Sequence, residues 1–353
     1  MRILILSQTF PLTPRDSCAH FLYDFAAGLK SVKQQVFVLL PYHPKLKINQ
    51  FKGLKVSYFK YIWPERLHLL GFGQTLINDQ DLHWYVYLLA PFYLFFGFIA
   101  LWRLVKKERI EIINAHWLLP NGFLAALVSK VTGIPLVITL PGSDVYLAKK
   151  NPLYYLLAKF ALKQTREVVS NSPQLLADLK VSGEVISYPV LLNTGKRVIN
   201  IVPKVATAGR RVEKKGFSFL QSIYPDIEII SDLPIDDFRQ KLRSVDIFIA
   251  PSIRDSRGNL DDASLVVLEA MAAGCTVITS DLPGYRRMIR SGQNGLLVSP
   301  NVKKAWVAAI GRCKKSKTLR QKLGRNAQQT IKNYFTLQKI ARKYYKLFLA
   351  TTI

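Results

Sequence analysis

Cysteine is scarce in this chain of 353 residues, which contains only Cys18, Cys275 and Cys313. Three cysteines are too few for a disulfide framework or for a cysteine-rich zinc site. A chain of this length buries about three quarters of its unfolded surface, so it can be stable without either. We therefore expect free thiols in a reducing compartment and predict no metal site.

Acidic residues are also few, since 23 Asp and Glu stand against 50 Lys and Arg and leave a formal net charge of +27. Such a surface attracts nucleic acid, anionic lipid headgroups or a phosphorylated small molecule, although a generally basic proteome would give the same charge. The chain has neither a zinc-finger pattern nor the aromatic motif of RNA-binding sheets. Nucleic acid is therefore not expected as a partner.

The amino-terminal apolar run, residues 3–6, is short. A signal peptide needs a longer apolar core and a cleavage site of small residues. The run is instead typical of a buried parallel strand that opens at residue 2. The expected location of the protein is therefore the cytoplasm.

Strand and helix patterns alternate in two successive series. The first predicts a helix over 16–30 and strands at 2–7, 36–40, 110–115 and 136–139. The second predicts a helix over 265–273 and strands at 205–208, 227–230, 246–250 and 276–279. This order predicts an α/β protein with two mostly parallel sheets, each covered by helices on both faces. We expect an N-terminal domain at 1–187, a C-terminal domain at 188–333, and a final helix at 334–353 that packs back on the first domain.

One segment departs from this alternation of strands and helices, because the 19 residues from 84 to 102 carry no charge. Its length suits a buried core helix, a helix lying in a membrane interface, or a true membrane span. A span would place the strands at 2–7 and 110–115, which belong to one sheet, on opposite sides of the membrane. A basic cluster follows the segment, formed by Arg103, Lys106, Lys107 and Arg109. We predict peripheral binding to the anionic inner face of the membrane.

Basic residues follow the first strand of the second series, where Gly209-Arg210 precedes Lys215-Gly216. Open α/β sheets bind ligands at the carboxyl ends of their strands, so Arg210 and Lys215 would bring positive charge to that site. Arg presents a planar fork to phosphate oxygens, and Lys presents a point charge. The alternative is that both are ordinary surface residues in a basic chain.

A helix start lies farther along, at Ser264, and its first N–H groups favour an anion. Glu269 follows in an otherwise apolar helix. Burying a lone carboxylate is costly unless it binds something, and a ribose diol would suit it. The alternative places Glu269 at the solvent edge of the helix.

These motifs together resemble the retaining glycosyltransferases of family 4. The resemblance rests on Gly209-Arg210, Lys215-Gly216, an acidic residue eight positions before Glu269, and Gly292-Gln293-Asn294-Gly295. In the first half it rests on Phe10-Pro11, the stretch from Ala115 to Gly122, Gly142-Ser143-Asp144, and Ser170-Asn171-Ser172. The resemblance covers nearly the whole chain.

The family implies the GT-B fold, in which two Rossmann-like domains face each other across a cleft. The C-terminal domain would bind a nucleotide-diphosphate sugar, and the N-terminal domain a glycan or lipid-linked acceptor. No metal and no cofactor are implied. By resemblance, the donor would be held by Arg210 and Lys215 at the diphosphate, by N–H groups around Ser264, Leu265 and Val266 at the helix start, and by Glu269 at the ribose. Asp261, Asp144 and His116 would be the catalytic residues, although a His in the position of His116 is often a packed core residue.

Several positions depart from the family pattern. Pro141 stands where a His usually precedes Gly-Ser-Asp, and Arg287 where a Glu is usual. The first acid, Asp261, is one methylene shorter than the usual Glu. One clear strand lies between Gly216 and Asp246, so the C-terminal domain is expected to be shortened. These departures leave a degenerate, non-catalytic protein that binds a glycan or protein partner as the alternative function.

Overall fold

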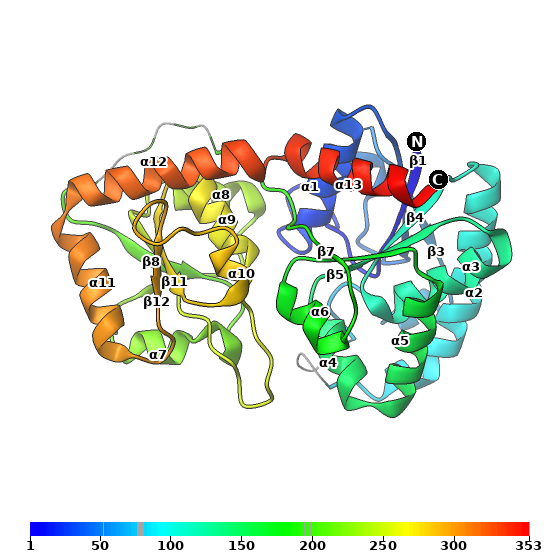
Figure 1. The fold of residues 1–353 in the computed structure, drawn as a ribbon. Helices are drawn as coiled ribbons and strands as arrows, with labels where there is room; N and C mark the ends of the chain where they lie inside the picture. The colour runs from blue at the N-terminus through cyan, green and yellow to red at the C-terminus, as the bar shows by residue number, and fades with distance from the viewer. Residues whose placement is uncertain (52, 76–80, 194, 196, 198–199, 353) are drawn as a thin grey trace. The chain divides into compact units, whose positions relative to one another are not determined.

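The computed structural model describes residues 1–51, 53–75, 81–193, 195, 197 and 200–352, without the side chains of Ser143, Asp144 and Lys149. The chain folds as two compact units (Figure 1). The first consists of Met1–Ser187 and Ile340–Ile353, and the second of Tyr188–Lys339. The second unit thus ends six residues after the expected limit at 333, and the first unit is built from two separate parts of the chain.

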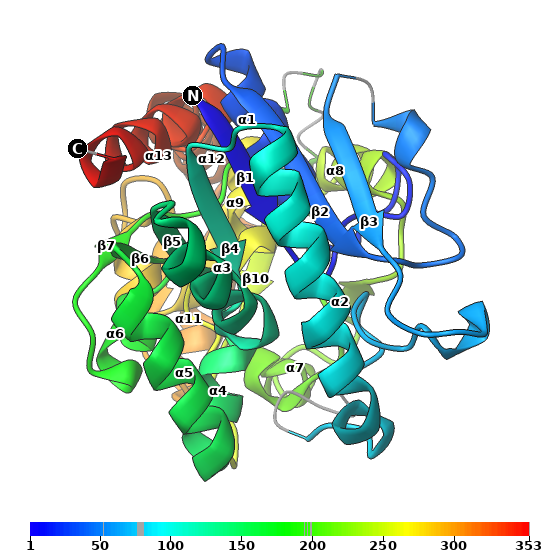
Figure 2. The same cartoon turned by 90° about the vertical axis from the view of Figure 1, so that its right-hand side faces the viewer.

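The first unit contains a seven-stranded parallel sheet in the order β3-β2-β1-β4-β5-β6-β7 (Figure 2). Its strands are apolar runs because both faces of the sheet are covered by helices. The strand order reverses between β1 and β4, which pair directly, with Ile3 opposite Ile112. The strands are β1 (Arg2–Leu6), β2 (Gln35–Pro41), β3 (Lys55–Phe59), β4 (Ile112–His116), β5 (Leu136–Leu140), β6 (Glu167–Ser170) and β7 (Glu184–Val185).

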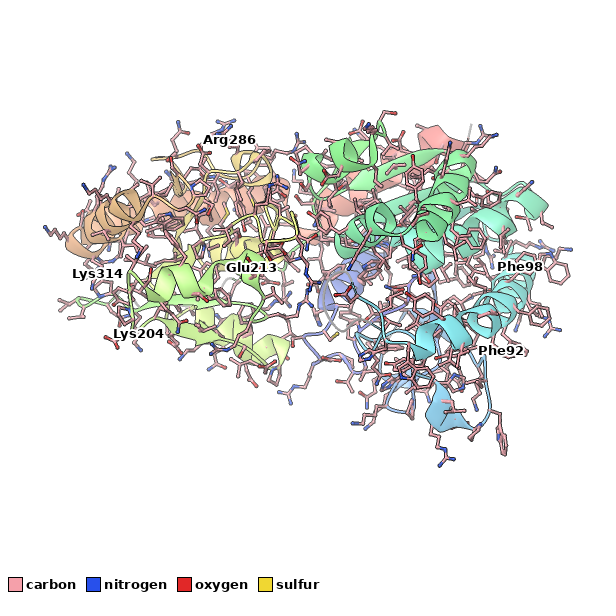
Figure 3. The ribbon with its side chains drawn as sticks, turned by 90° about the horizontal axis from the view of Figure 1, so that it is seen from below. Phe92, Phe98, Lys204, Glu213, Arg286 and Lys314 are labelled. Atoms are coloured by element: carbon pink, nitrogen blue, oxygen red, sulfur yellow. The ribbon has the colours of Figure 1, made fainter. Side chains whose placement is uncertain are left out.

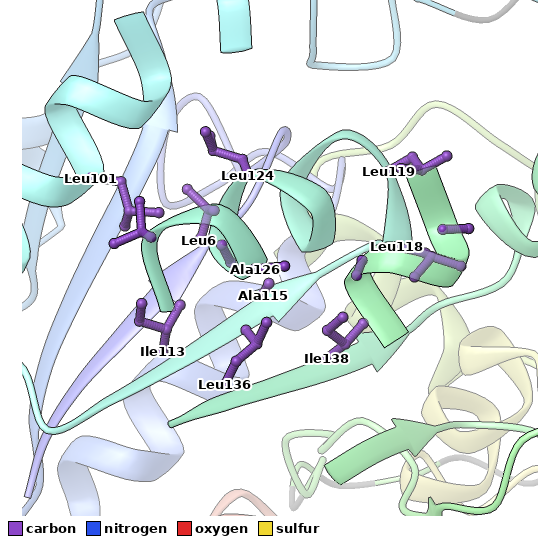
Figure 4. Packing of buried hydrophobic residues seen from close by; sticks show 14 of the residues in the cluster. Leu6, Leu101, Ile113, Ala115, Leu118, Leu119, Leu124, Ala126, Leu136 and Ile138 are labelled. Carbon is purple, nitrogen blue, oxygen red and sulfur yellow. The ribbon is translucent and has the colours of Figure 1, made fainter. Parts of the chain in front are cut away.

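Helices cover both faces of this sheet, and the main core lies under α2, α3 and α5. Leu101 of α2 and Leu124 of α3 pack there with Ile113 and Ile138 of the sheet (Figure 4). The helices are α1 (His20–Ser31), α2 (Tyr85–Lys107), α3 (Phe123–Thr132), α4 (Ser143–Lys150), α5 (Pro152–Gln164) and α6 (Pro173–Leu179). The expected helix at 16–30 begins only at His20, because the Asp16 carboxylate accepts hydrogen bonds from the Leu12 and Cys18 N–H groups and holds a turn.

The last helix, α13 (Leu337–Thr352), completes the other side of the first unit. Its buried residues Ile340, Ala341, Tyr344 and Phe348 recur at helical spacing. The Tyr344 ring meets the Phe25 ring of α1 edge to face, with centroids 4.6 Å apart. The end of the chain therefore supplies part of the core of the N-terminal unit.

The uncharged segment forms most of α2, which has one buried face and one exposed face. Its buried residues are Val86, Leu89, Tyr93, Gly97, Leu101 and Val105. A Cβ at Gly97 would lie 2.8 Å from Leu124 Cδ2, so α2 and α3 pack closely at this glycine and a larger residue would displace the Leu124 side chain. The helix is long and apolar enough to span a bilayer, with 28% of its most apolar window buried. It connects β3 to β4, which belong to the same sheet with β2 and β1 between them, so the core interpretation holds for one face and leaves the other face open.

The second unit contains a five-stranded parallel sheet in the order β12-β11-β10-β8-β9. The order reverses between β8 and β10, which places a ligand crevice beyond their carboxyl ends. In residues 216–246, all of which the structure describes, β9 is the single strand, as the shortened domain requires. The strands are β8 (Val205–Ala208), β9 (Glu228–Ile230), β10 (Ile247–Ala250), β11 (Thr276–Ser280) and β12 (Leu296–Val298). The helices are α7 (Phe217–Gln221), α8 (Ile235–Leu242), α9 (Leu265–Ala272), α10 (Pro283–Arg286), α11 (Lys303–Lys315) and α12 (Lys317–Tyr334).

Candidate active site

Lys215 lies at the switch point of the second unit because two glycines leave space for its side chain and for the backbone that follows it. Gly209, directly after β8, has φ 132°, and a Cβ there would lie 3.2 Å from Lys215 Cε. Gly216 has φ 68°, and a Cβ there would lie 2.1 Å from the Pro251 carbonyl oxygen after β10. Larger residues at either position would push the lysine loop away from the sheet edge.

Three of the predicted site residues meet at this edge. Lys215 Nζ lies 2.6 Å from Asp261 Oδ2 and donates a hydrogen bond of 2.7 Å to Ser264 Oγ. Ser264 is the N-cap residue of α9, and its hydroxyl is used to hold the lysine. Leu265 and Val266 form the first turn of α9, where backbone N–H groups lack partners within the helix. The cluster therefore joins an ammonium group to a helix N-terminus, which is a suitable place for a diphosphate.

Asp261 is held ionised by its basic surroundings. Burial alone would raise the pKa of this carboxyl group, but Lys215, followed by Lys214 and Arg210, lowers it below its usual value. Arg210 itself is exposed to solvent. The arrangement concentrates positive charge around one carboxylate, so the net field at the edge favours an anionic ligand.

Asp262, the residue after Asp261, stabilises the start of α10. Its buried carboxylate accepts a 2.8 Å hydrogen bond from the Gly284 N–H at the start of α10. Tyr285 follows, fully buried, with its hydroxyl 2.9 Å from Ser252 Oγ. Burial first, and then the Asp261 charge, raises the pKa of Tyr285. Sequence reasoning missed Tyr285 and Ser252 and considered Arg287, whose side chain is exposed.

Glu269 is buried in α9 against Arg239 of α8. The two side chains are 5% and 9% exposed, and the Arg239 Nη2 lies 2.8 Å from Glu269 Oε1. Arg239 Nε approaches both carboxylate oxygens, at 3.3 and 3.2 Å. The solvent-edge alternative for Glu269 is therefore wrong, and its role at a ribose remains a prediction. Arg239 was missed, although it occupies the buried stripe of α8 between Ile235 and Leu242, where an apolar residue would be expected.

The candidate residues of the first unit, His116 and Asp144, lie on two separate elements. His116, the last residue of β4, is fully buried, and its ring lies 5.4 Å from the Phe25 ring. Burial lowers the pKa of His116 to about 3, so it is neutral at physiological pH. This environment is that of a packed core residue rather than of a catalytic group. Asp144 lies in the first turn of α4, directly after β5, and its side chain is outside the described part of the structure.

In the part of the chain that the structure describes, no three His, Cys, Asp or Glu side chains gather as ligands for a metal ion.

Two family models match this chain. The one described as "Glycosyl transferases group 1" matches residues 203–330, and the one described as "Glycosyl transferase 4-like" matches residues 86–172. The first covers the whole Lys215–Asp261–Ser264 cluster. Both models are typical of GT-B glycosyltransferases, family 4 among them, which confirms the resemblance seen in the sequence.

Relatives and solved structures agree with these matches. An uncharacterized glycosyltransferase of Methanocaldococcus jannaschii is 23% identical over 66% of this chain and 73% of its own length. A putative teichuronic acid biosynthesis glycosyltransferase of Bacillus subtilis, TuaC, is 24% identical over 69% of this chain and 71% of its own length. The crystal structure of Anabaena HepE in complex with UDP and glucose superposes with a TM-score of 0.67 at 16% identity, covering 99% of this chain and 100% of HepE.

Proposed function

Because this chain is a glycosyltransferase of the GT-B fold, we propose that it moves a hexose, with retention of anomeric configuration, from a nucleotide-diphosphate sugar to a hydroxyl group. The acceptor is a lipid-linked or cell-envelope glycan. The observation that carries the donor assignment is the contact of Lys215 with both Asp261 and Ser264 at the start of α9. Relatives that act in cell-envelope glycan biosynthesis, such as TuaC, support the acceptor class.

In this proposal the donor diphosphate lies against Lys215, Arg210 and the first N–H groups of α9. These groups neutralise the charge that develops on the diphosphate as it leaves, so the reaction runs without a metal ion or a cofactor. Asp261, kept ionised beside Lys215, accepts hydrogen bonds from hydroxyl groups of the sugar. Glu269, which Arg239 holds in place, is assigned to the ribose of the donor by the resemblance to the family.

The chemical step exchanges one bond at the anomeric carbon for another. The bond from this carbon to the diphosphate oxygen breaks, and a bond to the acceptor oxygen forms on the same face of the sugar. The acceptor proton passes to the departing diphosphate oxygen, so no protein nucleophile is required. The protein's part is to orient the donor and to stabilise the leaving group.

The acceptor assignment is supported by the outer face of the first unit. Phe92 lies on the exposed side of α2 (Figure 3). Large apolar side chains that are about half exposed or more continue this face over α2 and α5, namely Trp84, Tyr87, Leu88, Phe92, Phe95, Leu153, Tyr155 and Leu156. Exposed Arg103, Lys106 and Lys107 follow at the end of α2. We call this surface the α2–α5 face and propose that it rests on the anionic inner surface of the membrane, with about 1 kcal/mol gained for each basic residue near the lipid.

A donor screen tests the proposal. Nucleotide sugars with uridine, guanosine and adenosine bases are added one at a time, and the unfolding temperature is recorded. A donor at 100 times its dissociation constant adds about 2.7 kcal/mol of stability, which gives a clear shift. With that donor, proton NMR of the product should show the anomeric configuration of the donor, and excess chelator should leave the rate unchanged. Inversion would refute the retaining mechanism, and loss of the rate in chelator with recovery in Mg²⁺ would refute the metal-free one.

A further inference from the structure

A cavity lies at the switch point of the first sheet, within the first unit. Gln8, two residues after β1, and Trp117, directly after β4, both line it. The carboxyl ends of the two strands at which the order reverses are where open α/β sheets bind ligands. The position of the cavity is therefore that of a ligand site within the first unit.

The backbone at the cavity is also unusual. Trp117 has φ 70° and ψ 136°, although it is neither glycine nor asparagine. A bulky residue in this region of φ/ψ space is strained, and strained residues are often found at ligand sites. The conformation turns the chain sharply from β4 into the segment Leu118–Gly122, whose Leu119 and Pro120 form part of the cavity wall.

The cavity wall is almost entirely hydrocarbon. Ala90 and Leu94 of α2, Phe123 of α3 and Leu157 of α5 contribute to it. The nearby Tyr93 hydroxyl already donates a hydrogen bond to Asn121. A sugar ring would lose several hydrogen bonds to water in such a place and regain few. The wall therefore favours an apolar ligand over a glycan.

The size of the cavity sets the length of chain that it holds. Its volume is about 130 Å³. An engineered apolar cavity of about 150 Å³ binds benzene, so this one accommodates about six carbon atoms. That length is close to one isoprene unit or a short stretch of an acyl chain. Removing these carbon atoms from water is the main source of affinity for such a chain.

The cavity shares a wall with the α2–α5 face. Tyr154 of α5 lines the cavity, and its ring stacks on that of Tyr87, with centroids 6.5 Å apart. Tyr87 is 56% exposed on the outer side of α2. The Tyr87–Tyr154 pair thus joins the exposed α2–α5 face to the wall of the cavity.

We propose that this cavity binds the hydrocarbon chain of the acceptor, an isoprenoid or acyl chain, next to the carboxyl ends of β1 and β4. The inference rests on the proposed function and adds to it a chain-binding site in the first unit. The chain would hold the acceptor hydroxyl at the edge of the first sheet, and an acceptor without a hydrocarbon chain would bind more weakly.

Binding of simple alcohols tests the site independently of catalysis. The isoprenoid alcohol geraniol and 1-octanol are titrated into the full chain by calorimetry, below the concentrations at which they aggregate. Leu157→Trp fills the cavity, and Leu156→Trp makes the same change on the neighbouring residue, which is 62% exposed. We expect the wild type and Leu156→Trp to bind both alcohols alike, and Leu157→Trp to bind them at least tenfold more weakly. Thermal unfolding shows whether each variant is folded, and Ala90→Phe fills the cavity from α2 if Leu157→Trp fails to fold.

Several results would overturn the inference. One is that the wild type binds neither alcohol, and another is that Leu157→Trp binds them as tightly as the wild type. A third is that Leu156→Trp loses as much affinity as Leu157→Trp, which would place the alcohols on the outer face. So would a wild-type dimer in sedimentation that Leu157→Trp abolishes, because the cavity would then serve a second copy of the chain. The donor screen is run on the same wild-type sample. Donor binding without alcohol binding would refute only the chain site, and alcohol binding without donor binding would refute the proposed function.

Discussion

Replacing Lys215 by Met removes the cation at the centre of the second unit's cluster and keeps a side chain of similar length. In the wild type, Nζ of Lys215 lies 2.6 Å from Asp261 Oδ2, and the two side chains are 16% and 21% exposed. Removing one partner of a fully buried pair costs about 3–5 kcal/mol. Because this pair keeps some contact with water, we expect Lys215→Met to lower the free energy of unfolding by about 1–3 kcal/mol at pH 7.

The pH dependence of this loss has a definite sign. In the wild type the lowered pKa of Asp261 contributes stability that is present above the unfolded pKa, about 3.9, and is lost as the pH falls through the folded value. Without Lys215, burial is the largest remaining influence and raises the folded pKa of Asp261. The ionised carboxylate then destabilises the fold increasingly as the pH rises from about 4 through that raised pKa. The difference between variant and wild type should therefore be small at pH 4 and large at pH 7.

Donor binding should change separately from stability. Loss of a charge-assisted contact to the diphosphate is worth about 1.5–3 kcal/mol, or about ten- to a hundredfold in donor affinity. Asp261→Asn added to Lys215→Met removes the uncompensated charge, so the double variant should regain stability but not donor affinity. Lys322→Met removes one exposed lysine of α12 and serves as the matched control for charge.

Urea unfolding at pH 4 and pH 7, together with calorimetric titration of the donor found in the screen, measures both effects. If Lys215→Met binds that donor as tightly as Lys322→Met does, the diphosphate does not lie at Lys215. If its stability loss is the same at both pH values, the account of the Asp261 charge is wrong.

Three further results are expected. Arg239→Met should cost about 3–5 kcal/mol in urea unfolding because it removes the ion-pair partner of the buried Glu269 carboxylate, and adding Glu269→Met should recover most of the loss; a single variant as stable as the wild type would contradict this. In the wild type, stability should fall between pH 6.5 and pH 4, because His116 binds a proton in the unfolded chain but stays neutral in the fold, where its pKa is about 3. His116→Gln should make this fall in stability smaller. An unchanged slope would show that His116 is not buried as described. Phe95→Ser on the α2–α5 face should weaken co-sedimentation with anionic vesicles more than Val307→Ser, an exposed apolar residue of the second unit, and equal effects would count against the membrane proposal.

The sequence predicts the buried strands best, because their continuous apolar runs reflect burial on both faces of a parallel sheet. The expected strand at 205–208 is β8 in the structure, and that at 276–279 lies within β11. The edge strand β3, with the sequence KVSYF, was missed because exposed and half-buried residues weaken its apolar pattern. An edge strand pairs with one strand only and is less fully buried than a central strand, so its sequence contains fewer consecutive apolar residues.

Parts of the candidate site could be predicted for a similar reason. Lys215, Asp261 and Ser264 follow β8 and β10, and neighbouring parallel strands bring their carboxyl ends together. The Arg239–Glu269 pair could not be foreseen, because it depends on the rotation of α8 against α9 rather than on spacing within either helix. The burial of His116 depends likewise on α1, which packs on the face of the sheet toward which its ring turns.

The two-part construction of the first unit has a consequence for how the protein is made. A ribosome adds about 5–20 residues per second, so the residues Tyr188–Lys339 take about 8–30 s to synthesise. Throughout that interval the nascent chain contains β1 to β7 and α1 but not Tyr344 and Phe348, and Phe25 lacks the ring that covers it in the finished protein. The second unit is continuous in sequence and can fold as it emerges. The unit translated first is therefore completed last, and its uncovered face is the part of the nascent chain that a chaperone would need to shield.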